Sequence, residues 1–139
     1  IGHESRGVPL VERVCERLRT PGAYRELAIK TCALHLKCHR LLEMRPSRVM
    51  ALIEEADLLR RPEQLESLPP ACEADFRGRK GFEDRAYPQA HRLSAALEAV
   101  LGIQARQLDT DGLDGREIGK MLREARIDAI RACNSGPAS

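Results

Sequence analysis

Aromatic side chains are scarce in this 139-residue sequence: it has no tryptophan, and two tyrosines and two phenylalanines make up only 3% of it. Leucine, alanine, arginine and glutamate are abundant instead, so any core must be aliphatic and the residues favour helix over strand. The apolar residues, 42% of the chain, are enough for one ordinary domain or two small ones. We therefore expect an all-α protein, an irregular helical bundle.

Long apolar runs are also missing. No run approaches the about 18 residues that span a bilayer, and no signal-peptide pattern opens the sequence. The five cysteines form no C-x-x-C pair, and Cys15, Cys32 and Cys38 lie on or beside apolar helix faces, as small core residues do in a reducing compartment. These patterns favour a soluble, cytoplasmic protein with no membrane partner. The start at Ile1, without methionine, suggests a sequence cut from a longer chain.

A large excess of one charge is absent as well. The formal net charge is +2, which is too small to require a nucleic-acid partner. Any argument for such a partner must rest on where the 23 lysines and arginines lie.

Prolines and glycines divide the sequence into helical segments. The apolar spacing predicts helices over residues 9–19, 23–42, 46–60, 62–69, 88–102 and 116–133. The first would have an apolar face formed by Leu10, Val11, Val14, Cys15 and Leu18, and the third would bury Val49, Met50, Ile53 and Ala56. Pro9 suits a first helical position, whereas Pro69 and Pro70 predict a kink or restart. We expect residues 103–115 to be irregular or at most a short turn of helix, and residues 134–139 to form a disordered tail.

The last predicted helix has a basic stripe. Its apolar residues, Ile118, Met121, Leu122, Ala125 and Ala129, share one face. The opposite side carries Arg116, Lys120, Arg123 and Arg131. Such a stripe can follow the phosphates of a nucleic acid, but it is equally typical of a solvated amphipathic helix.

Two glycine-containing stretches also allow two interpretations. "TDGLDGREIG" precedes the last helix, where free amides could bind an anion or Asp114 could simply cap the helix. In "EADFRGRKGFEDR", cations surround Gly78 and Gly81, and Phe76 and Phe82 can anchor the segment. Those cations, Arg77, Arg79, Lys80 and Arg85, could grip an anionic partner or belong to a packed, charge-balanced loop.

His35 and His39 lie four residues apart on a predicted helix, a spacing that points both imidazoles the same way and suits a divalent metal. His3 could complete the set, but no H-E-x-x-H pattern or carboxylate pair is nearby. The alternative is a pair of histidines whose nitrogens are satisfied by hydrogen bonds. His91 is expected on a helix surface.

Four segments together resemble a known family. "GHESRGVPLVERVCERLRTP", "HLKCHRLLEMRPSRVMALIEEADLLRRPEQLESL", "CEADFRGRKGFEDRAYPQ" and "LDGREIGKMLREARIDAI" are similar to the C-terminal portion of bacterial CCA-adding tRNA nucleotidyltransferases that carry an HD phosphohydrolase domain. The match covers nearly the whole chain, and the string "EADxRGRxGxED…YPQ" is distinctive.

The resemblance implies an enzyme that adds or repairs the 3′ CCA end of tRNA with CTP and ATP. Its magnesium-binding catalytic head precedes this sequence, which has no "GG…DxD" pattern, so this chain alone is expected to be inactive. Residues 1–58 would be the end of the HD domain, residues 59–133 a helical body or tail module that binds tRNA, and 134–139 a tail.

The resemblance also bears on the histidines. The family pattern "HDLxH" reads here His35, Leu36, Lys37, Cys38, His39, so Leu36 replaces an aspartate and removes a hard oxygen ligand. His3, His35 and His39 match family positions, and they are candidates for a remnant site for nickel or another divalent metal.

By the same resemblance, six basic residues are the predicted tRNA-binding set: Arg77, Arg79, Lys80, Arg116, Lys120 and Arg123. They would contact phosphates and 2′-hydroxyls and read the shape of the tRNA. Two alternatives stay open: a metal-dependent phosphohydrolase using His3, His35 and His39, and a helical interaction or dimerisation module.

Overall fold

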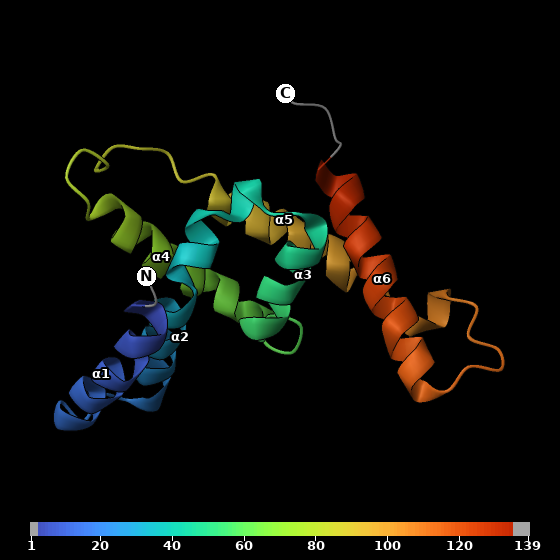
Figure 1. Ribbon diagram of the computed structural model, residues 1–139, viewed down its shortest axis with the longest axis horizontal. Helices are drawn as coiled ribbons and strands as arrows, with labels where there is room; N and C mark the ends of the chain where they lie inside the picture. Colours follow the sequence, from blue (N-terminus) through green and yellow to red (C-terminus); the bar gives the residue numbers. More distant parts are fainter. Residues whose placement is uncertain (1–2, 135–139) are drawn as a thin grey trace. The chain divides into compact units, whose positions relative to one another are not determined.

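Helices and connecting turns account for all of residues 3–134, the range that the computed structural model describes, with side chains from residue 6 to residue 133. The helices are α1 (His3–Arg17), α2 (Gly22–His39), α3 (Pro46–Glu55), α4 (Leu68–Arg77), α5 (Gln89–Leu101) and α6 (Gly115–Asn134) (Figure 1). Short 3₁₀ helices cover Leu41–Glu43, Pro62–Glu66 and Ala105–Gln107. No strand occurs within this range, which confirms the all-α prediction.

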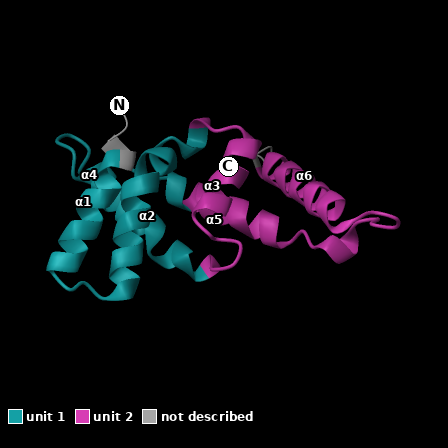
Figure 2. Ribbon diagram, turned by 60° about the horizontal axis from the view of Figure 1, so that its bottom comes forward, with its two compact units in different colours: residues 1–42, 63–90 teal, residues 43–62, 91–139 magenta. Residues whose placement is uncertain are grey.

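The chain forms two compact units, and each is built from two separate stretches of sequence (Figure 2). Unit 1 comprises the described residues up to Leu42 together with residues 63–90, and unit 2 comprises residues 43–62 together with those from His91 onward. These units do not follow the predicted modules 1–58 and 59–133, which remain a prediction about the family.

Unit 1 is organised around α2, which packs against α1 and α4. Its buried side chains include Leu34 and Cys38 from α2 and Leu68 and Cys72 from α4. Pro69 and Pro70 lie in the first turn of α4, where a missing amide proton breaks no helical hydrogen bond. The predicted restart at these prolines is therefore confirmed.

The prediction for the first helix is partly wrong. Pro9 does not open α1 but lies inside it, because the helix already begins at His3 and accommodates the loss of one backbone hydrogen bond. The predicted apolar face is also only partly covered. Cys15 is buried, but Leu10, Val14 and Leu18 are 55%, 45% and 65% exposed.

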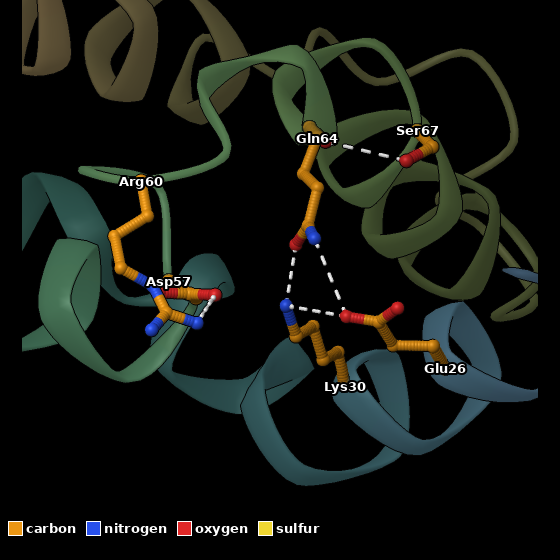
Figure 3. A network of polar contacts seen from close by, with 6 residues as sticks. All are labelled: Glu26, Lys30, Asp57, Arg60, Gln64 and Ser67. Carbon is orange, nitrogen blue, oxygen red and sulfur yellow. Dashed lines mark hydrogen bonds and ion pairs between the residues drawn. The ribbon is translucent and has the colours of Figure 1, made fainter.

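A polar network fixes the second stretch of unit 1 to α2 (Figure 3). The Lys30 ammonium lies 3.1 Å from the Glu26 carboxylate and donates to the Gln64 side-chain oxygen at 2.5 Å. The Gln64 amide donates in turn to Glu26 at 3.3 Å, and the Ser67 hydroxyl donates to the Gln64 carbonyl. This network holds the 3₁₀ turn that leads into α4.

Unit 2 has an aliphatic core in which α3 packs against α6. The predicted core residues Val49, Met50 and Ile53 are each at most 1% exposed. The other buried side chains of this unit are Leu52, Ala56, Leu58, Leu93, Ala96, Leu97, Val100 and Ile130. The third helix ends at Glu55, earlier than predicted, because Asp57 takes a positive φ of 60° and the Leu58 amide bonds back to the Ile53 carbonyl.

None of the helices in residues 3–134 is long and apolar enough to cross a membrane.

Candidate nucleic-acid interface

The segment after α4 carries the first group of predicted basic residues, and its shape depends on glycine. Gly78 ends α4, and Gly81 adopts a φ of +86°, which an L side chain rarely tolerates. The Phe82 amide donates to the Arg79 carbonyl at 2.9 Å across this turn, and nearby backbone amides lower the pKa of the Glu83 carboxyl. The turn is therefore an organised structure rather than a random linker.

The three cations of this segment that belong to the predicted tRNA-binding set differ in how they are held. Arg77 lies 2.7 Å from the Glu73 carboxylate and donates to the Arg85 carbonyl at 3.2 Å. Arg79 is a looser partner of Asp75, at 3.9 Å. Lys80 is exposed and makes no hydrogen bond or ion pair with any residue described. Lys80 is thus the most available cation of the three.

Contacts between aromatic rings hold this segment in place. Phe76 contacts Phe82 with ring centroids 5.0 Å apart and Tyr87 at 5.3 Å. The Arg85 guanidinium lies over the Phe82 ring, 4.1 Å from its centroid. The anchoring expected of Phe76 and Phe82 is confirmed.

The second group of basic residues lies on α6, in unit 2. Asp114 caps this helix by accepting from the amides of Arg116 and Glu117 at 2.9 and 2.8 Å, while the Glu117 carboxylate accepts from the Asp114 amide. Because this capping box already engages the amides of Arg116 and Glu117, the structure favours the cap over an anion site at this helix start.

The side chains along α6 also differ in availability. Arg116 and Lys120 are exposed and have no side-chain partner in the part of the chain described. Arg123 forms a bidentate pair with Glu54 at 2.9 and 3.0 Å, which raises the pKa of Arg123 and joins α6 to α3. Arg131 pairs with Asp128 on its own helix.

Two of the three predicted metal ligands, His35 and His39, have described side chains, and each makes hydrogen bonds to the protein. The side chain of His3 lies outside the described residues. His35 directs Nδ1 at the Thr31 and Cys32 carbonyls, 3.0 Å from each. His39 has both ring nitrogens engaged, with Nε2 2.9 Å from the Asp75 carboxylate and Nδ1 3.0 Å from the Tyr87 hydroxyl.

No group of three or more histidine, cysteine, aspartate or glutamate side chains suited to a metal ion occurs among the residues with described side chains. The geometry around His35 and His39 corresponds to the alternative of hydrogen-bonded histidines. Asp75 and Tyr87 were not identified as partners of His39 from the sequence, although both lie in the string "EADxRGRxGxED…YPQ" that carries the family resemblance.

The cysteines behave as core residues in unit 1. Cys15, Cys38 and Cys72 are buried and Cys32 is half-buried, whereas Cys133 in unit 2 is exposed. The thiols of Cys38 and Cys72 are hydrogen-bonded to each other, and this bond together with burial raises the pKa of Cys72. All five are free thiols.

Several curated proteins are similar to this chain, and they share one name. A multifunctional CCA protein of Thioalkalivibrio sulfidiphilus is 48% identical over 130 residues, which is 94% of this chain and 32% of that protein. Those of Xanthomonas campestris pv. campestris and Acinetobacter baumannii are 47% and 43% identical over 96% and 94% of this chain, again about a third of each relative.

No family model matches the sequence, and no solved structure matches it. The relationship to the curated proteins nevertheless agrees with the resemblance carried by the four sequence segments. Nearly the whole length of this chain is therefore homologous to a region of the multifunctional CCA proteins, and that region makes up about one third of each of those proteins.

Proposed function

We propose that this chain is a tRNA-binding part of a CCA-adding tRNA nucleotidyltransferase, which acts in the cytoplasm. The observation that carries this proposal is the 48% identity over 94% of the chain to a multifunctional CCA protein. The remaining two thirds of such a protein would supply nucleotide transfer from CTP and ATP with magnesium. This chain would hold and position the tRNA whose 3′ end is extended.

Exposed cations without internal partners support this role. Lys80, Arg116 and Lys120 can approach phosphates without first giving up an ion pair. Arg77, Arg79 and Arg123 are also exposed, but each is already paired with a carboxylate, so binding RNA would have to replace that pair. We infer that Lys80, Arg116 and Lys120 are the main phosphate contacts within the predicted set.

The phosphohydrolase alternative is less favoured. Leu36 occupies the position of the family aspartate, and His39 is engaged on both nitrogens by Asp75 and Tyr87. A divalent metal at His39 would have to displace one of these hydrogen bonds and would still lack the oxygen ligand.

A salt-dependent titration with tRNA lacking CCA tests the proposal. The variant Lys80→Ala, Arg116→Ala, Lys120→Ala should bind more weakly, and its plot of log affinity against log salt should be shallower by about 1 for each phosphate that is no longer neutralised. The matched control replaces Arg13, Arg17 and Arg25 by alanine, because these arginines are also exposed and their removal lowers the net charge by the same amount.

The control should keep most of the affinity and the slope. Equal losses of affinity in the two triple variants would mean that the chain attracts any polyanion through its net charge, and the assignment of a tRNA surface would be wrong.

A further inference from the structure

Both ends of the basic turn are fastened to one residue of α2. We define the basic turn as residues 77–85, which carry Arg79 and Lys80. On its N-terminal side, the Asp75 carboxylate lies 2.9 Å from Nε2 of His39. On its C-terminal side, the Tyr87 hydroxyl lies 3.0 Å from Nδ1 of the same ring. The Gln89 side chain adds a third link, since it donates to the His39 carbonyl at 2.9 Å.

The hydrogen bonds are chemically consistent with a neutral imidazole. In the tautomer that carries its proton on Nε2, this nitrogen donates to the Asp75 carboxylate and Nδ1 accepts from the Tyr87 hydroxyl. Tyr87 remains protonated as this requires, because burial above all raises the pKa of its hydroxyl. No metal ion or additional proton is needed to satisfy the ring.

Packing holds the imidazole in this orientation. The His39 side chain is only 8% exposed. Its ring lies 5.5 Å from Phe76, 5.8 Å from Tyr87 and 5.7 Å from His35, measured between centroids. The bond between His39 and the buried Tyr87 is therefore stronger and more strictly oriented than one made in water, whereas the Asp75 carboxylate on the other side is 45% exposed.

We propose that His39 is a positioning residue that closes the base of the basic turn and thereby presents Arg79 and Lys80 to RNA phosphates. Asp75 links the closing of the turn to the placement of Arg79, since its carboxylate accepts a hydrogen bond from His39 and lies 3.9 Å from the Arg79 guanidinium. The RNA part of this inference rests on the proposed function, whereas the ordering of the turn does not.

Fixing the ends of the basic turn before it binds would increase its affinity for RNA. A turn whose ends are fixed loses less conformational freedom when it binds than a free segment does, so more of its contact energy appears as affinity. If His39 releases the turn, Arg79 and Lys80 keep their charges but lose their arrangement.

The test uses variants that remove one link without emptying the core. Tyr87→Phe deletes only the hydroxyl, and Tyr24→Phe is its matched control because Tyr24 is 68% exposed on the same helix as His39. Asp75→Ala deletes the other link. Asp84→Ala is its control, since it removes the same charge from within the turn. Asp75→Asn retains an acceptor for Nε2–H and should restore the protection that Asp75→Ala loses.

Hydrogen exchange followed by mass spectrometry should show at least tenfold faster exchange over residues 78–86 in Tyr87→Phe and Asp75→Ala, with the rest of unit 1 unchanged. The two controls should match the parent chain. Unchanged exchange in the turn, or a uniform increase throughout unit 1, would overturn the inference, because His39 would then be only a core residue.

tRNA titration supplies the second readout. Asp75→Ala makes the chain more positive, so a purely electrostatic effect would strengthen binding, as Asp84→Ala should. The inference instead expects Asp75→Ala to bind severalfold more weakly. A loosened turn with unchanged or stronger binding would overturn the positioning role. If the parent chain itself does not bind tRNA, the proposed function fails, and the exchange data alone decide whether His39 orders the turn.

Discussion

Lys120 and Arg123 lie three residues apart on α6, yet their side chains are in different states. Lys120 extends into solvent, whereas the Arg123 guanidinium is held by both oxygens of Glu54. Sequence periodicity places both on the basic stripe and cannot distinguish them. The distinction matters because the same substitution would test RNA binding at one position and the packing of α6 on α3 at the other.

Replacing Arg123 by alanine should mainly affect stability. The expected loss in the free energy of unfolding is about 0.5–1 kcal/mol, a small value because both partners are more than a third exposed and water screens the pair. A double-mutant cycle with Glu54→Ala, measured by urea denaturation, isolates the pair. Lys120→Ala is the control for helix propensity and should leave stability almost unchanged. A coupling energy near zero would contradict a stabilising role for the pair.

His39 illustrates why a site can be hidden in a sequence. Its partners Asp75 and Tyr87 are 36 and 48 residues away, so no helical periodicity connects them. The core is different, because Val49, Met50 and Ile53 recur at helical spacing and were predicted from that pattern alone. The Asp114 cap was similarly available from local sequence. Contacts between residues far apart in the sequence, such as those of His39, could not be predicted in this way.

At the scale of the helix, the residue at position 7, within α1, is limited by the close approach of a side chain from α2 rather than by helix propensity. A Cβ added at Gly7 would lie 2.7 Å from the Cys32 sulfur, so any larger residue here requires the Cys32 side chain to shift. The pattern of apolar residues gave no indication of this contact. It also led to the wrong start at Pro9 and to a face on which Leu10, Val14 and Leu18 are in fact exposed.

Two glycine substitutions should therefore change stability in opposite directions. Gly119→Ala lies inside α6 with open space around its new methyl group, and it should stabilise by up to about 1 kcal/mol. Gly7→Ala gains the same propensity but must displace Cys32, so we expect a net loss of about 1–3 kcal/mol. Thermal unfolding monitored by circular dichroism measures both.

The double variant Gly7→Ala, Cys32→Ala should recover most of that loss, because it removes the sulfur atom that the methyl group meets. If Gly7→Ala proves as stabilising as Gly119→Ala, then α1 and α2 separate easily and the close approach has no energetic weight.

At the scale of the whole molecule, the two units alternate along the sequence, so each unit is built from two stretches that are separated by a stretch of the other. α2 packs on α4 across a long stretch of sequence that belongs to unit 2, and α3 packs on α6 in the same manner. The family resemblance predicts a module boundary after residue 58, but the sequence cannot show which helices become neighbours in space.

Cutting the chain after residue 58 should abolish folding of both pieces. The cut separates α2 from α4 and α3 from α6, so each piece retains only part of either unit. We expect neither 1–58 nor 59–139 to unfold cooperatively in denaturant, whereas the intact chain should. Two pieces that each gave a cooperative transition would instead support the predicted modules 1–58 and 59–133 as independent folding units.

The distribution of thiols gives each unit its own chemical reporter. Cys15, Cys32, Cys38 and Cys72 all belong to unit 1, and Cys133 belongs to unit 2, where it is exposed. A maleimide dye therefore attaches first at the end of α6 without any engineered cysteine. The rate at which a disulfide-exchange reagent then modifies the remaining thiols measures the opening of unit 1 alone. The unmodified sequence thus carries both a labelling site in unit 2 and a set of thiols that reports on the unfolding of unit 1.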